Sequence, residues 1–419
     1  MARLARVEAF APDEIATLHV MNRVVRRCFL MGTDELTGKN YDHRKTWVEI
    51  ALKRLAAGFG IDLLNFAILS NHFHLILRSR PDVVATWDDA EVARRWLILC
   101  PVRKSADGGA AEPSEPELNS IRYDEDKVKT IRSRLSDISW WMRLLSQRIA
   151  QRANVEDQIA GKFWQSRYRA VRLIDDDAIL ACAAYVDLNP IRAGMAQTIE
   201  DSQFTSARLR LQTIADAAQA AVGSSEVSIG ATAALVSSDE DSSSDAVDLT
   251  ESIDCESPSG RTAESIGSCA LDVGQPPAPG SPAPRAMRVS AEFKAAVDGF
   301  LTPIEIDELN DPIGPRTSFG RQRCSDKGFL GMPAAAYMEL LDWTARQIVN
   351  GKRGATPEDA PPIFERLKIK PAVWCELVTR FGKLFSQVAG QPHRVDEFRG
   401  RLRKKRYRLR QAARELLKA

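Results

Sequence analysis

Two of the chain's five histidines lie one residue apart in the stretch ILSNHFHLILR, residues 68–78. Side chains at positions i and i+2 of a strand share a face, so His72 and His74 should project together while Phe73 enters a core. Two neutral imidazoles at this spacing can bind one divalent metal ion from one side. A single HxH motif is a weak signal, and two partly exposed histidines on a solvated strand face are the alternative. His19, in another expected strand, either borders this pair or has a plain structural role.

A metal ion held by two histidines can polarise a phosphate oxygen, and phosphoryl chemistry of this kind also needs a nucleophile. The sequence contains no GxSxG elbow and no GxxxxGK[ST] phosphate loop. Tyr185, one of six tyrosines, lies in an expected helix whose neighbours on the same side are small. Asn189, four residues later, could offer an amide oxygen as a third metal ligand, or could merely end the helix together with Pro190. Tyr168 is a rival nucleophile, but it has no polar partner at helical spacing.

The residues around these motifs predict a small sheet with helices. The stretches 16–32, 61–69 and 72–78 have the composition of strands. Apolar residues recur at helical spacing within 41–60, where two glycines end the helix. The order strand–helix–strand–strand is the first half of a ferredoxin-like split βαβ sheet. Further helices are expected over about 88–99, over about 134–153, and from about Asp177 to the Asn189–Pro190 stop.

The composition indicates a soluble, cytoplasmic protein with no membrane partner. No apolar run is long enough to span a bilayer, and the N-terminus MARLARVEAFAPDE lacks the apolar core of a signal peptide. The seven cysteines form no CxxC pair, which argues against a zinc ribbon. Residues 216–284 contain twelve acidic residues and one basic residue. Because the whole chain carries +2, this segment's −11 leaves +13 elsewhere, a charge that suits a nucleic-acid partner.

Low-complexity composition divides the chain into three parts. Residues 216–288 have no aromatic residue and are rich in Ser, Ala, Gly and Pro, so they cannot bury enough apolar surface to offset the entropy of ordering. This predicts a disordered acidic linker between an N-terminal domain, 1–215, and a mainly helical, basic C-terminal domain, 289–419. A shorter break, SADGGAAEPSEPE at 105–117, predicts a mobile insertion that extends over about 101–128.

Two basic stretches are candidate DNA contacts. KFWQSRYRAVR, 162–172, interleaves basic residues, which can follow phosphates, with aromatic residues, which can stack on bases. The alternative is that Trp164 lies in the core and the arginines form a solvated face. The run RGRLRKKRYRLR, 399–410, gives either salt-sensitive DNA affinity or another solvated helix face. The residues assigned to DNA binding are Lys162, Arg167, Arg169, Arg172 and Arg192.

Three motifs in this order, SNHFHLIL, FWQSRY and AAYVDLNPIRAGM, resemble the single-tyrosine HUH transposases, most closely the branch of REP-associated tyrosine transposases. The likeness covers roughly residues 15–210. It implies an α+β fold with a ferredoxin-like antiparallel sheet, the HUH palm. It also implies that His72, His74 and Asn189 bind Mg²⁺ or Mn²⁺ and that Tyr185 is the nucleophile.

The resemblance implies an enzyme that cleaves and rejoins single-stranded DNA, often beside a hairpin, through a 5′-phosphotyrosine link. Because the covalent bond conserves the energy of the phosphodiester, no nucleotide cofactor is needed. Two other functions stay open: a catalytically silent protein that binds hairpin DNA, and a nicking enzyme of the replication-initiator or relaxase type. The resemblance also leaves open whether the protein is a monomer or a homodimer that shares active-site parts.

Overall fold

The computed structural model describes residues 13–25, 28–103, 111–233, 297–306, 322–349, 364–365, 368–402 and 407–418. The chain divides into two compact units, one made of 1–218 with 295–419 and the other of 219–294. Most of the predicted linker and part of the basic run at 399–410 lie outside the described residues. The beginning of that linker, residues 216–233, belongs to helix α10, Ser206–Ala233. Alanine residues at 217, 218, 220 and 221 favour this continuation of the helix beyond residue 215.

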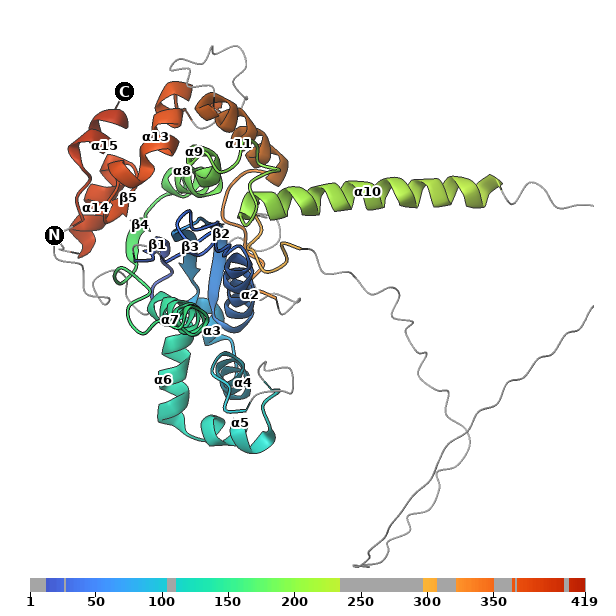
Figure 1. Ribbon diagram of the computed structural model, residues 1–419, viewed down its shortest axis with the longest axis vertical. Coiled ribbons are helices and arrows are strands. Elements are labelled where there is room, and N and C mark those ends of the chain that lie inside the picture. The colour runs from blue at the N-terminus through green and yellow to red at the C-terminus, as the bar shows by residue number, and fades with distance from the viewer. Residues whose placement is uncertain are drawn as a thin grey trace, which may run out of the picture. The chain divides into compact units, whose positions relative to one another are not determined.

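A five-stranded sheet organises the first unit. The strands are β1 (Thr17–Arg23), β2 (Ile61–Ile68), β3 (His72–Ser79), β4 (Arg169–Leu173) and β5 (Val388–Ala389). They lie in the order β2-β3-β1-β4-β5 (Figure 1). The central strand β1 is antiparallel to both β3 and β4, β2 and β3 form an antiparallel pair, and β5 runs parallel to β4. The fold is therefore of the α+β class that the sequence predicts.

Alternation along the strands separates two hydrophobic cores. Phe73, Leu75 and Leu77 point toward the face that is covered by α2 (His43–Gly58) and α7 (Ile138–Asp157). Ile76, together with the two histidines of β3, points toward the opposite face, which α8 (Asp176–Asp187) covers. Figure 1 shows α8 on one side of the sheet and α2 and α7 on the other. Phe73 is therefore a core residue, as the motif predicted.

The predicted insertion is largely helical where the structure describes it. Residues 104–110 lie outside the described part, but α5 and α6 occupy most of the rest of that range. Ser114 begins α5 with a capping box, in which the Glu117 carboxylate accepts a hydrogen bond of 2.7 Å from the Ser114 backbone N–H. Ile121 and Val128 are buried and attach the two helices to the core. The helices in this region are α3 (Pro81–Ala85), α4 (Asp89–Leu99), α5 (Glu115–Arg122) and α6 (Glu125–Leu135).

More than half of the described C-terminal residues are helical, and they belong to the same compact unit as the N-terminal sheet. Their helices are α11 (Ala334–Val349), α13 (Pro371–Leu384), α14 (Pro392–Leu402) and α15 (Gln411–Leu416). Tyr337, Trp374 and Phe381 belong to the same core as α8, and β5 extends the sheet itself. They pack there because α8 is apolar and buries eight of its twelve residues, so it needs cover on more than its sheet-facing side. None of the described helices is long and apolar enough to cross a membrane.

A buried ionic cluster joins the N-terminal sheet to the C-terminal residues. The Asp62 carboxylate on β2 forms ion pairs with Arg78 at 2.7 Å and Arg80 at 3.3 Å. It also accepts hydrogen bonds from the Ser325 hydroxyl at 2.7 Å and the Cys324 thiol at 3.1 Å. Burial raises the pKa of Asp62, but the two arginines and these hydrogen bonds outweigh it, so the pKa lies below its usual range. Two parts of the chain more than 250 residues apart are thereby fastened together.

Candidate active site

Three histidines gather on the sheet face that α8 covers. His19 of β1 and His74 of β3 lie side by side, with His19 Nε2 and His74 Nδ1 2.9 Å apart and their rings stacked. The ring of His72 lies 5.0 Å from that of His74. His19 and His74 are both buried, whereas His72 is half-buried. His19, which the sequence left between two roles, therefore belongs to the site, because the pairing of β1 with β3 places it there.

Hydrogen bonding leaves suitable nitrogens for a metal ion. His72 Nδ1 lies 2.7 Å from the Asn71 side-chain oxygen, which can only accept, so this nitrogen carries the proton and Nε2 keeps its lone pair. If His74 is the same tautomer, its Nδ1–H donates a hydrogen bond to His19 Nε2, and its own Nε2 is unprotonated. That Nε2 is buried and has no hydrogen-bond partner within the described part of the chain. Ligating histidines commonly donate their other N–H in this way, so the pair fits a divalent cation.

Burial keeps these imidazoles neutral, which is the form that binds metal. It lowers the pKa of His19 to about 3, with Arg169 adding to the effect, and the pKa of His72 to about 4, with Arg23 adding to the effect. The pKa of His74 lies well below its usual range because of burial and of the two neighbouring histidines. At neutral pH His72 and His74 therefore each keep a lone pair on Nε2, whereas the lone pair of His19 Nε2 accepts the hydrogen bond from His74.

The same burial predicts a loss of stability in mild acid. The unfolded chain binds protons at His19 and His74 below a pH of about 6.5, whereas the folded chain does not, so the free energy of unfolding falls as the pH decreases. We expect a decline of about 1.4 kcal/mol per pH unit for each of these histidines between about pH 6 and pH 4. Urea unfolding in the presence of a chelator measures it. His19→Gln should flatten the decline, and the exposed His393→Gln should leave it unchanged.

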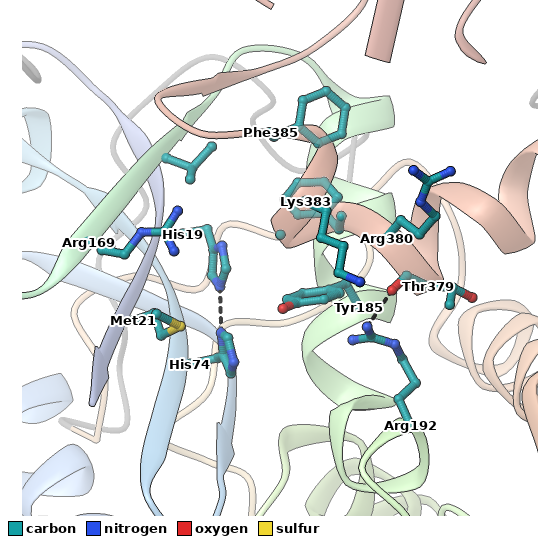
Figure 2. A pocket seen from close by; sticks show the side chains of 13 residues that line it. His19, Met21, His74, Arg169, Tyr185, Arg192, Thr379, Arg380, Lys383 and Phe385 are labelled. Carbon is teal, nitrogen blue, oxygen red and sulfur yellow. Dashed lines mark hydrogen bonds between the residues drawn. The ribbon is translucent and has the colours of Figure 1, made fainter. Parts of the chain in front are cut away.

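Helix α8 places Tyr185 beside the histidines. The helix begins where the Asp175 carboxylate accepts a hydrogen bond of 2.9 Å from the Ala178 N–H. Nearly three turns later the ring of Tyr185 lies 5.5 Å from that of His74 and 5.8 Å from that of His19, edge-on to both. Figure 2 shows its phenol oxygen pointing toward the histidine pair.

The rival nucleophile is placed elsewhere. The Tyr168 hydroxyl lies 3.2 Å from the Ser139 hydroxyl, and Tyr168 lines a different cavity. Trp164 packs edge-on against Phe73, with ring centroids 5.5 Å apart, and donates a hydrogen bond to the Ser146 carbonyl. Trp164 is thus mainly a core residue, and Tyr185 is the tyrosine that the fold brings to the histidines.

A cavity of about 360 Å³ lies beside Tyr185, His19 and His74, and His72 does not line it (Figure 2). It is lined by His19, Met21, His74, Arg169, Val171, Tyr185, Arg192, Thr379, Arg380, Phe381, Gly382, Lys383 and Phe385. Four of these side chains are cations, and none of the described residues that line the cavity is acidic. The Arg192 guanidinium lies 4.5 Å from the centre of the Tyr185 ring and donates a hydrogen bond to the Thr379 carbonyl. The arrangement can hold an anion next to a tyrosine and two imidazoles.

Asn189 does not line this cavity. It begins the one-turn helix α9, Asn189–Arg192, and is buried. Within the described part of the chain, no three His, Cys, Asp or Glu side chains are grouped around a possible metal position. The structure thus brings His72 and His74 together without Asn189, and the role of Asn189 as a third ligand stays a prediction.

The predicted DNA-binding residues fall into three groups. Arg169 and Arg192 line the cavity beside Tyr185. Lys162 and Arg167 are exposed and line a second cavity of about 460 Å³. Arg172 is buried on the opposite face of β4 from Arg169 and forms an ion pair of 2.6 Å with Glu14. Only the first group lies at the histidines and Tyr185, and a DNA contact stays a prediction for all five residues.

The segment Thr379–Phe385, the end of α13 and the residue after it, is the part of the site that the sequence did not predict. It covers Tyr185 from nearly 200 positions away in the chain. Phe381 is fully buried, with its ring 5.5 Å from that of Tyr185. The sequence pointed to this segment only indirectly. The apolar α8 requires another element to cover it, but nothing in the sequence of α8 identifies which helix does so.

Comparison with known proteins adds little beyond the motifs. No protein-family description matches the chain, and no curated protein matches it. A solved structure of a REP-associated tyrosine transposase bound to a REP hairpin is similar over 46% of this chain and 76% of its own, with 12% sequence identity. The TM-score of 0.26 is too low to establish a shared fold.

Proposed function

We propose that this protein is a metal-dependent enzyme that cleaves and rejoins single-stranded DNA, with Tyr185 as the nucleophile and hairpin-forming DNA as the substrate. The observation that carries the proposal is the position of Tyr185 beside the paired imidazoles of His19 and His74, in a cavity whose charged lining residues are all cations. The three sequence motifs support it. The strand order β2-β3-β1-β4, with β1 antiparallel to both neighbours, also suits a ferredoxin-like split βαβ sheet.

The residues of the site divide the chemistry among them. His72 and His74 would hold Mg²⁺ or Mn²⁺, which when bound polarises a phosphate oxygen. Arg169 and Arg192 neutralise the negative charge of the phosphate and hold it near the tyrosine. The Tyr185 oxygen attacks phosphorus and forms a 5′-phosphotyrosine link, while the bond to the 3′ oxygen breaks and releases a 3′-OH. Attack of a 3′-OH on the same phosphorus reverses the step and frees the phenol.

Adduct formation tests this function. The chain is incubated with a labelled hairpin from the DNA that flanks its own gene, and the products are separated under denaturing conditions. We expect a protein–DNA adduct with Mg²⁺ or Mn²⁺ and none with EDTA. Hairpin binding without cleavage should persist in EDTA, because the arginine and lysine side chains of the cavity keep their charge without the metal ion. Failure to form an adduct across such hairpins would contradict an enzymatic role.

One observation favours a second candidate function. Asn189, the proposed third ligand, is buried, and neither Asn189 nor His72 lines the cavity beside Tyr185. A protein that binds hairpins without cutting them would have the same cations and no need of that ligand. The adduct experiment separates the two, because a silent binder shows full affinity for the hairpin and no covalent product with either metal.

A further inference from the structure

We propose that the end of α13, a part of the chain outside the resemblance, forms one wall of the substrate site: Lys383 binds a phosphate of the DNA strand, and Gly382 keeps the space that the Tyr185 hydroxyl occupies. This inference rests on the proposed function and deepens it. It assigns a role in substrate binding to the C-terminal part of the chain, whose contribution the sequence left open.

The charges around the cavity support Lys383 as a phosphate ligand. Lys383 is exposed, and no carboxylate among the described residues lies within ion-pair distance of its ammonium. Figure 2 shows its side chain reaching from α13 toward Tyr185, while Arg169 lies on the other side of the cavity. A strand that passes between β4 and α13 would therefore meet a cation from each side, with the tyrosine at the base. Arg380, the next cation of α13, is paired instead with Glu376.

Gly382 has a specific steric role. A Cβ atom at this position would lie 3.0 Å from the Tyr185 hydroxyl oxygen, closer than nearly all real Cβ contacts. Glycine is an unfavourable residue in the last turn of a helix such as α13, so its presence there calls for a local reason. Clearance for the reacting oxygen supplies that reason. A larger side chain would require the phenol oxygen to shift by a few tenths of an ångström.

Hydrogen bonds and ring contacts fix the end of α13, residues 379–385, against Tyr185. Arg192 donates a hydrogen bond to the Thr379 carbonyl, so the residue that covers the tyrosine ring also fastens α13. Phe381 packs under both Tyr185 and His19, with ring centroids 5.5 and 6.1 Å apart respectively. The backbone of Lys383 is bound as well, because Arg410 donates a hydrogen bond to its carbonyl.

Affinity for a labelled hairpin, measured in EDTA over a range of salt concentrations, tests the role of Lys383. Lys383→Ala should weaken binding about three- to tenfold for hairpins of any loop sequence and reduce the slope of log K against log salt by about 0.7, the value for one single-strand phosphate contact. Lys129→Ala is the matched control, because Lys129 is an exposed lysine of α6 that does not line the cavity. It should change neither quantity.

The rate of adduct formation tests Gly382. Gly382→Ala should slow the adduct at least about tenfold while hairpin affinity and Tm stay close to those of the wild type. Gly400→Ala, in α14, is the control, since a Cβ there would meet nothing within 4 Å.

If Lys383→Ala and Gly382→Ala behave like their controls in a protein that binds hairpins and forms adducts, the proposal for α13 is wrong although the proposed enzymatic function holds. If either variant accelerates the adduct, α13 obstructs the strand rather than binding it. A wild type that neither binds nor reacts overturns the proposed function itself.

Discussion

Replacing Tyr185 with phenylalanine should lower adduct formation by about 10³-fold or more and leave hairpin affinity within about twofold of the wild type. The substitution removes one oxygen and retains the ring, whose contacts with His19, His74 and Phe381 keep the site in shape. The loss should therefore appear in the covalent step alone. It is measured by separating labelled products under denaturing conditions, with binding measured in EDTA.

Tyr168→Phe is the matched control for this experiment. It also removes a phenol oxygen, but the oxygen that it removes is bonded to Ser139 and belongs to another cavity. We expect adducts at close to the wild-type rate, with at most a small loss of stability from the missing hydrogen bond. An adduct that survives in Tyr185→Phe but vanishes in Tyr168→Phe would transfer the nucleophile to Tyr168 and contradict the site described above.

The largest expected effect on stability comes from Asp62→Ala. Asp62 is fully buried between two arginines, of which Arg80 is itself almost completely buried. Removing Asp62 takes away the carboxylate that Arg78 and Arg80 share, although Asp82 still pairs with Arg80 at 2.7 Å, and we expect the free energy of unfolding to fall by about 3 kcal/mol. The hydroxyl of Ser325 loses its acceptor as well. Urea unfolding at neutral pH measures the difference.

Asp326→Ala provides the comparison. Its carboxylate forms an ion pair of 2.7 Å with Arg323, but both side chains are partly exposed, so we expect a loss of about 1 kcal/mol or less. Equal losses in the two variants would show that the buried cluster contributes no more than a surface ion pair. Because Asp62 joins the sheet to residues 324 and 325, Asp62→Ala should also expose the C-terminal part to proteolysis before the sheet itself unfolds.

Much of the local structure could be predicted from sequence patterns. The period-two alternation of 72–78 predicted a strand with Phe73 on one face and two histidines on the other, and β3 has this form. The 3.6-residue periodicity of 41–60 and the acidic cap before α8 predicted helices that begin and end within a few residues of the observed bounds. These features depend on neighbours along the chain, and a sequence displays such neighbours directly.

Composition indicated less about packing. Arg172 was grouped with Arg169 as a DNA contact, and this stays a prediction, but an odd separation along β4 places the two on opposite faces, and Arg172 forms an ion pair with Glu14. The insertion at 101–128 was predicted as mobile from its Gly, Ala and Pro content, yet a capping box and two buried apolar residues make most of its described part helical. In both cases a specific contact outweighed the average character of the segment.

By itself, the sequence determined which residues are candidates for the site: an HxH pair aimed at one face, a tyrosine on a helix with small neighbours, and basic residues on both sides of that tyrosine. Only the tertiary structure decided which of these groups meet. The register of β1 against β3 brought His19 to His74, and the packing of α13 on α8 brought Phe381, Gly382 and Lys383 to Tyr185. Contacts of this kind join residues tens to hundreds of positions apart. They depend on how buried surfaces pack against one another, and the local periodicity of a sequence does not predict that packing.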